Sequence, residues 1–229
     1  MQEWRKFMKN KYCDVSVYVM ALLFIILSPI AAKFISPFFD YVGYGAMKPF
    51  FNELFTGIIW IVEIVIMAVF YAKKLNHNII SNPETKGQEL PMKRIIFIGM
   101  VVAACILIIS AQIRFQVKPF YDLGEKFNGY ELMNNVGIFI RNIVKCIWIV
   151  IMIKAAQNLV ETITKKDKII YPVAGMVLML TLGIYDLIMG MNNLAVTYFF
   201  LYLVYGWIYL LTERSMSKSY MLILFIFMF

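Results

Sequence analysis

The sequence predicts an all-α polytopic membrane protein, in which six full transmembrane helices form three hairpins and a short or truncated seventh helix follows. Hydrophobic residues make up 62% of the chain and charged residues 16%, against about 45–50% and 25% in ordinary soluble domains. The apolar residues gather in long runs, and most of the basic residues flank those runs. We therefore expect lipid to be the main solvent of this protein.

Seven apolar runs follow one another, and the first six are each close to the ~20 residues that cross ~30 Å of hydrocarbon. The run that begins at Val15 is too long for a typical signal peptide, so we expect it to be retained, with a kink at Pro29. Pro172 suits the first turn of the fifth helix, which we expect to end near Asp186. The seventh run has ten residues, so it is either a half-span packed against the bundle or a truncated helix. The runs are 15–35, 54–72, 93–113, 132–156, 172–186, 194–211 and 220–229.

The chain divides into a short segment, 1–13, and one transmembrane helical bundle, 14–229. In the first segment Trp4 and Phe7 alternate with basic residues, which indicates either an interfacial amphipathic helix or a disordered basic tail. Of the 22 Lys and Arg residues, fifteen lie on the N-terminal side of the bundle and five on the other side. The positive-inside rule then places the N-terminus in the cytoplasm, and we expect a bacterial plasma membrane.

An aromatic–aspartate string recurs where apolar runs end. The sequence Pro-Phe-Phe-Asp-Tyr at 37–41 returns as Pro-Phe-Tyr-Asp-Leu at 119–123, with a looser copy, Ile-Tyr-Asp-Leu, at 184–187. We expect one helical hairpin used three times, with extracytoplasmic turns whose aromatic rings form an interfacial belt or a ligand-binding cage. The aspartates of these turns are secondary candidate site residues: Asp40, Asp122 and Asp186.

Charged residues inside the predicted spans are the first candidates for a site. Aligning the first two copies of the string without gaps carries Glu63 onto Lys145, and Arg141 lies one helical turn from Lys145 on the same face. An unpaired charge at the bilayer centre costs at least ~2.5–3.5 kcal/mol. We expect Glu63, Arg141 and Lys145 to form one buried polar cluster with an excess of positive charge, completed by an anionic group, another acid or water. In the alternatives, Glu63 and Lys145 only lock two helices in register, or a misjudged helix boundary exposes the charges.

Several kinds of chemistry lack their motifs here. The chain has no Gly-rich phosphate loop, no His-Glu-x-x-His and no nucleophile elbow, so we assign no catalytic residue and no cofactor. We expect no metal site around the single histidine, His77, and no nucleic-acid partner, because no recognition motif is present. Of the motifs of the CAAX-prenyl-protease type of intramembrane protease, the chain keeps one arginine, Arg141.

These observations favour transport or sensing of a small molecule or ion, with the polar cluster as the binding site. The alternative is a non-catalytic structural, accessory or immunity-type subunit, in which the same charges set the helix register. A degenerate relative of the CAAX-protease type ranks below both, and an enzyme would need chemistry that the sequence does not display. The expected partners are the lipid bilayer, a small-molecule or ion ligand, and either a second copy of the chain or a larger membrane complex.

Overall fold

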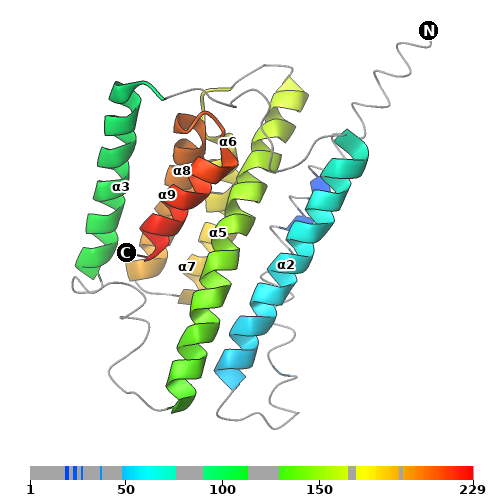
Figure 1. Ribbon diagram of the computed structural model, residues 1–229, viewed down its shortest axis with the longest axis vertical. Helices are drawn as coiled ribbons and strands as arrows, with labels where there is room; N and C mark the ends of the chain where they lie inside the picture. The colour runs from blue at the N-terminus through cyan, green and yellow to red at the C-terminus, as the bar shows by residue number, and fades with distance from the viewer. Residues whose placement is uncertain are drawn as a thin grey trace.

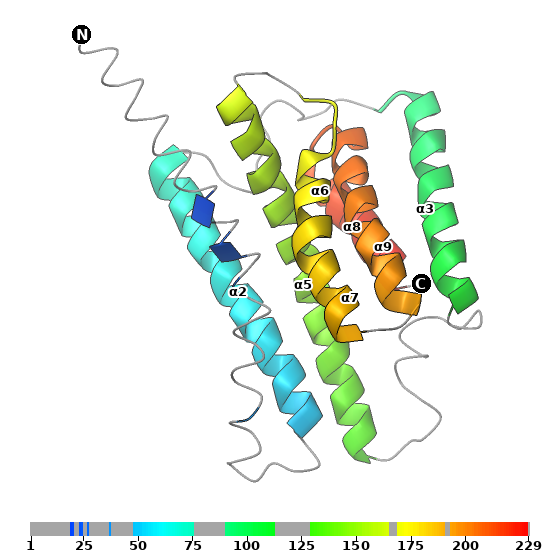
Figure 2. The same ribbon diagram turned by 180° about the vertical axis from the view of Figure 1, so that it is seen from behind.

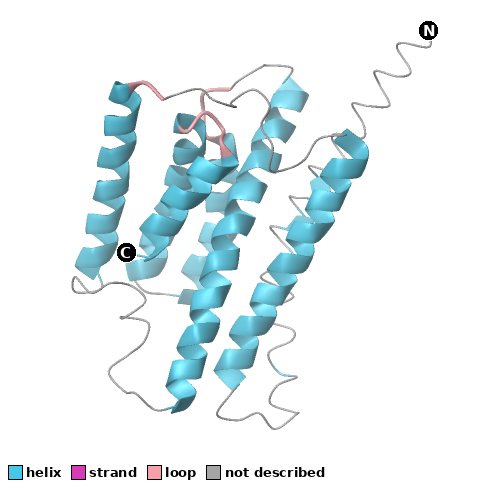
Figure 3. Cartoon of the chain, in the orientation of Figure 1, coloured by secondary structure: helices cyan, strands magenta, loops and turns pink. Residues whose placement is uncertain are grey.

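The computed structural model describes residues 48–75, 90–112, 129–164, 169–190 and 193–228, together with positions 19, 20, 23, 24, 27 and 37. Within these ranges the chain is all-helical and contains no strand (Figure 3), which confirms the predicted class. In chain order the elements are α2 (Lys48–Leu75), α3 (Met92–Gln112), α5 (Gly129–Thr164), α6 (Val173–Leu178), the π-helical turn η3 (Met179–Gly183), α7 (Ile184–Gly190), α8 (Asn193–Leu211) and α9 (Met216–Met228).

Three of these helices are long and apolar enough to cross a membrane. Their apolar segments are Glu53–Phe70 in α2, Met92–Gln112 in α3 and Val136–Glu161 in α5. The other apolar segments are shorter: Val173–Ile188, Ala195–Leu211 and Met216–Met228. The prediction of six full spans is therefore not confirmed, because the fifth and sixth runs give shorter apolar helices and most of the first run lies outside the described residues.

Helices that follow one another in the chain run in opposite directions along one long axis (Figures 1 and 2). α2 and α5 run parallel and side by side, and α6, α8 and α9 lie between α5 and α3. α3 packs against α8 and α9. The second predicted hairpin, formed by α3 and α5, keeps its antiparallel order, but α3 packs mainly on helices that lie far along the chain.

α5 is the central helix of the bundle. From Trp148 to Gln157 every side chain is buried, so this stretch is covered on all sides, as expected for an interior helix. α3 is the opposite case, because its buried residues form one stripe and its other residues are exposed or partly exposed. That stripe consists of Ile98, Val102, Cys105 and Ile109. α3 is therefore a peripheral helix of the bundle, with much of its apolar surface exposed.

α6 and α8 cross in backbone contact at two glycines. A Cβ atom built on Gly206 would lie 2.7 Å from the Cα atom of Gly175. A Cβ atom on Gly175 would lie 2.9 Å from the carbonyl oxygens of Tyr202 and Leu203. Small residues at a helix crossing let backbones approach closely, which is a main source of helix association in membranes. This crossing fixes the position of α8 against the start of α6.

Several predicted boundaries change. The aromatic–aspartate copy at 184–187 lies within α7, so the prediction of a turn there is wrong; these residues include no proline or glycine that would end the helix. The other two copies lie outside the described residues, apart from Pro37. α9 begins at Met216, earlier than the predicted start at residue 220, because the Ser215 carbonyl accepts the Ser219 N–H at 3.0 Å.

Candidate functional site

Glu63 lies on the side of α2 that faces α5, and its side chain is 6% exposed. Its carboxylate accepts a hydrogen bond from the indole N–H of Trp148, with 2.6 Å between Oε2 and Nε1. The ring of Trp148 also stacks on that of Trp60, with 6.0 Å between centroids. The structure thus gives Glu63 a different partner from the lysine that the repeat predicted. Trp148 lies three residues beyond Lys145, or about 4.5 Å along the helix axis.

Arg141 also faces α2. Its guanidinium forms an ion pair with Glu53, and its Nε and Nη2 atoms donate to Asn142 Oδ1 at 3.3 and 3.1 Å. The backbones approach closely here, since a Cβ atom on Gly57 would lie 3.7 Å from the Arg141 Cα atom. The charge of Arg141, which the sequence predicted to contribute to an excess of positive charge in the cluster, is therefore paired with a carboxylate outside that cluster, Glu53.

Lys145 is half-buried and is directed toward α8 and α9. Its ammonium nitrogen lies 6.0 Å from the ring centroid of Tyr202 and 5.7 Å from that of Phe227. Both distances are within the range of cation–π attraction. The hydroxyl of Tyr202 donates to Asp186 Oδ2 at 2.8 Å. Lys145 and Asp186 are thus linked through one tyrosine, between α5, α7 and α8.

The predicted three-residue cluster is therefore divided between two sides of α5. Glu63 and Arg141 belong to the α2–α5 interface, whereas Lys145 belongs to the interface of α5 with α8 and α9. Asp186, a secondary candidate, joins the Lys145 side. Asp40 and Asp122 lie outside the described residues. In the described ranges, no group of three His, Cys, Asp or Glu side chains could hold a metal ion.

A hydroxyl-bearing face of α8 completes the Lys145 side. Its members recur every three or four residues, so they share one face of the helix. They are Tyr198, Tyr202, Tyr205, Tyr209 and Thr212. The hydroxyl of Tyr205 is buried and has no hydrogen-bond partner among the described residues. The spacing of these residues was visible in the sequence, but aromatic residues at helical spacing are equally common in an apolar core.

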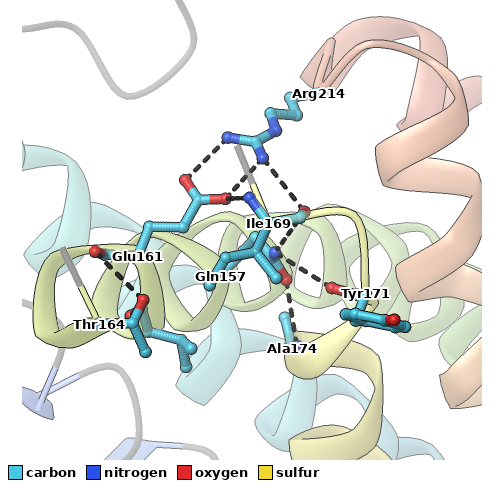
Figure 4. Close-up of polar contacts among 8 residues, drawn as sticks. Gln157, Glu161, Thr164, Ile169, Tyr171, Ala174 and Arg214 are labelled. Carbon is cyan, nitrogen blue, oxygen red and sulfur yellow. Dashed lines mark hydrogen bonds and ion pairs between the residues drawn. The ribbon is translucent and has the colours of Figure 1, made fainter. Parts of the chain in front are cut away.

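A second polar network closes the end of the bundle where α8 turns into α9 (Figure 4). Arg214 donates to both oxygens of Glu161, at 2.8 and 2.5 Å, and the same carboxylate accepts the backbone N–H of Ile169 at 2.9 Å. Gln157 donates to the carbonyl of Tyr171 at 3.2 Å and accepts the N–H of Ala174 at 3.3 Å. These contacts join α5, the segment before α6 and the α8–α9 turn.

Glu213 and Arg214, in that turn, have φ values of 58° and 62°. Left-handed backbone is unfavourable for residues with long side chains, so the surrounding contacts must hold it. Arg94 of α3 supplies one of them, with its Nη1 atom 2.7 Å from Glu213 Oε1. In the sequence, Arg94 and Arg214 belong to the fifteen basic residues on the N-terminal side of the predicted bundle. Their acidic partners, Glu161 and Glu213, lie on the same side of the predicted bundle, and this was the signal in the sequence that could have indicated the two ion pairs.

Comparison with known proteins gives no relative: no protein-family model, no curated protein and no solved structure matches this chain. The three long apolar helices are compatible with a membrane protein.

Proposed function

We propose that this protein binds a small molecule or ion inside the helical bundle, for transport across the membrane or for sensing. The observation that supports this proposal most directly is the position of Lys145. It lies within the apolar segment Val136–Glu161, yet its ammonium group is directed toward the aromatic face of α8 rather than along the helix to an interface. Ionisable residues inside a span that face the bundle interior commonly mark ligand, ion or proton pathways.

The surroundings of Lys145 supply several kinds of polar group. Tyr202 and Asp186 offer a hydroxyl and a carboxylate, and Tyr205 adds a second buried hydroxyl. The site would therefore lie among α5, α7, α8 and α9. In the proposed topology, with the N-terminus in the cytoplasm of a bacterial cell, Asp186 is on the extracytoplasmic side of Lys145.

The test uses purified protein in proteoliposomes and the variant Lys145→Met, which removes the charge and keeps the side-chain length. Flux of protons, potassium and chloride is measured with one sensor for each ion, and ligand binding is measured as a shift in thermal unfolding. We expect a protein-dependent flux or shift that falls at least about tenfold in Lys145→Met, the scale of one lost charged contact. Lys93→Met, at an exposed position, is the matched control and should behave as wild type. Flux and binding that do not depend on Lys145 would contradict the proposal.

A specific observation favours a second candidate, a structural or accessory subunit of an oligomer or larger membrane complex. Glu63 accepts a hydrogen bond and Arg141 forms an ion pair across the α2–α5 interface. Buried polar contacts of this kind can hold two helices in one register. Glu63→Gln separates the two functions, because an amide oxygen can still accept the Trp148 hydrogen bond. Lost flux or binding with an intact fold supports a functional Glu63, whereas wild-type behaviour of Glu63→Gln supports a structural role.

A further inference from the structure

Glu63 places an acidic side chain in the apolar middle of α2. It is 6% exposed, and it lies ten residues into the apolar segment Glu53–Phe70, or about 15 Å along the helix axis. In a bilayer whose hydrocarbon core is ~30 Å thick, that position is near the centre, where an unpaired charge is costly. A charged carboxylate at this depth needs a cation or several hydrogen-bond donors to replace its lost hydration.

The described residues offer this carboxyl group one hydrogen-bond donor, and that donor is neutral. The indole N–H of Trp148 donates to Oε2 of Glu63, with 2.6 Å between the two heavy atoms. Among the described residues Glu63 takes part in no ion pair, whereas Glu53, on the same helix, pairs with Arg141. In the first apolar run, much of which lies outside the described residues, the sequence has no charged residue from position 15 to position 32. One neutral hydrogen bond offsets only part of the cost of a buried charge.

The cations of the facing helix are directed to other groups or lie at another depth. α5 is the described helix with the most extensive packing on α2. Its Arg141 pairs with Glu53, and its Lys145 ammonium is directed to aromatic rings of α8 and α9. Lys154 lies about 9 Å further along α5 than the indole that donates to Glu63, and about 120° around the helix axis. Within the described part of the α2–α5 interface, a charged Glu63 would therefore have no counter-ion.

We propose that Glu63 is a proton-binding site, which holds one proton as the neutral carboxylic acid between α2 and α5. The proton comes from water and converts the carboxylate into the acid, which removes the buried charge. The carbonyl oxygen of that acid can still accept the Trp148 N–H. A proton suits this interface because it needs no cavity beside the stacked rings of Trp60 and Trp148, which lie 6.0 Å apart between centroids.

A proton at Glu63 makes the packing of α2 on α5 depend on proton occupancy, because its release returns a charge to the interface. Ionisable residues inside a span that face the bundle interior commonly mark proton or ion pathways. The site lies on a different side of α5 from the ring contacts of Lys145 and does not depend on a ligand there. It therefore goes beyond the proposed function.

The test is infrared difference spectroscopy of the purified full chain in a maltoside detergent, which has no carbonyl group of its own. A carboxylic acid has a carbonyl stretching band that a carboxylate lacks. We expect wild type at neutral pH to show such a band, which Glu63→Gln lacks and which disappears as the pH is raised. Trp148→Phe should keep the band and shift it to higher frequency, because the carbonyl group loses its hydrogen bond.

Glu53→Gln is the matched control, because it removes an acid of the same helix that already pairs with an arginine, and it should leave the band unchanged. If Glu63→Gln does not fold, the band of wild type and its shift in Trp148→Phe still test the site. Three results would overturn the proton site: no such band in wild type at neutral pH, equal bands in wild type and Glu63→Gln, or loss of the band in Glu53→Gln. Flux or binding that depends on Lys145 has no effect on these results, so the two proposals can fail separately.

Discussion

At the scale of single residues, Glu63 shows how an acid can be accommodated between apolar helices. The carboxylate is buried against α5 and receives the indole N–H of Trp148, while the stacked Trp60 ring covers the same region. A hydrogen bond to an ionised or strongly polar group contributes more than a neutral one, and its loss leaves the desolvated oxygen unpaired. Trp148 therefore stabilises the buried Glu63 through its hydrogen bond, in addition to the apolar surface that the indole ring itself buries.

We predict that Trp148→Phe lowers the free energy of unfolding by roughly 2–4 kcal/mol, from the lost hydrogen bond and the reduced ring volume. Adding Glu63→Leu should recover part of this loss, since replacing both polar partners by apolar groups can be nearly neutral. Unfolding in a detergent mixture, followed by circular dichroism, gives the double-mutant cycle. Strictly additive costs of the two substitutions would show that the hydrogen bond contributes nothing.

At the scale of secondary-structure elements, α8 is held in place differently at its two faces. One face contacts α6 through the Gly175–Gly206 crossing, where no side chain separates the two backbones. The face with the tyrosines is directed to the interior of the bundle. At the end of α8, the left-handed residues Glu213 and Arg214 reverse the chain and are held by ion pairs to Arg94 and Glu161. The turn therefore sets the position of α9 relative to α3 and α5.

We predict that Gly206→Ala destabilises the protein by about 1–3 kcal/mol, because its Cβ atom would meet the Gly175 backbone, which has no flexible end to move aside. Gly99→Ala on α3 is the matched control, since a Cβ atom there meets nothing within 4 Å. Alanine at position 99 should leave stability unchanged or raise it by up to ~1 kcal/mol, through helix propensity. The measurement is the unfolding free energy of both variants in the same detergent. Equal effects at the two positions would rule out a close-packed crossing.

At the scale of the whole molecule, sequence patterns predicted the all-helical class better than they predicted which helices are neighbours. Hydropathy marks where a helix is apolar, but in lipid the exposed surface is as apolar as the interior, so it does not say which helix packs on which. For that reason the position of α3 against α8 and α9 could not be predicted. The repeat aligned Glu63 with Lys145, which lies within one helical turn of Trp148, the observed partner of Glu63 on α5. It did not predict the direction in which each side chain points around the α5 axis.

The same limitation explains why the partners of Lys145 and Glu63 in the candidate site could not be predicted from the sequence. Lys145 could be recognised as a charge in an apolar run, whereas Tyr202, Phe227 and Trp148 are aromatic residues that no local pattern distinguishes from ordinary core. Their roles depend on the rotation of α5, α8 and α9 about their own axes. The ion pairs of Arg94 and Arg214 likewise join residues 119 and 53 positions apart in the chain, a separation that helical periodicity cannot detect.

The orientation of the whole bundle in the membrane is predicted from the basic residues rather than from packing. Fifteen of the 22 Lys and Arg residues lie on the predicted cytoplasmic side, where the Glu161–Arg214 network also lies. We predict that Ile170→Cys, 76% exposed beside that network, is labelled by a membrane-impermeant maleimide only after cells are opened. Met133→Cys, exposed at the other end of α5, should be labelled in intact cells. The unsubstituted chain measures the background from its own three cysteines. Labelling of position 170, but not of position 133, in intact cells would invert the topology and would place Asp186 on the cytoplasmic side of Lys145.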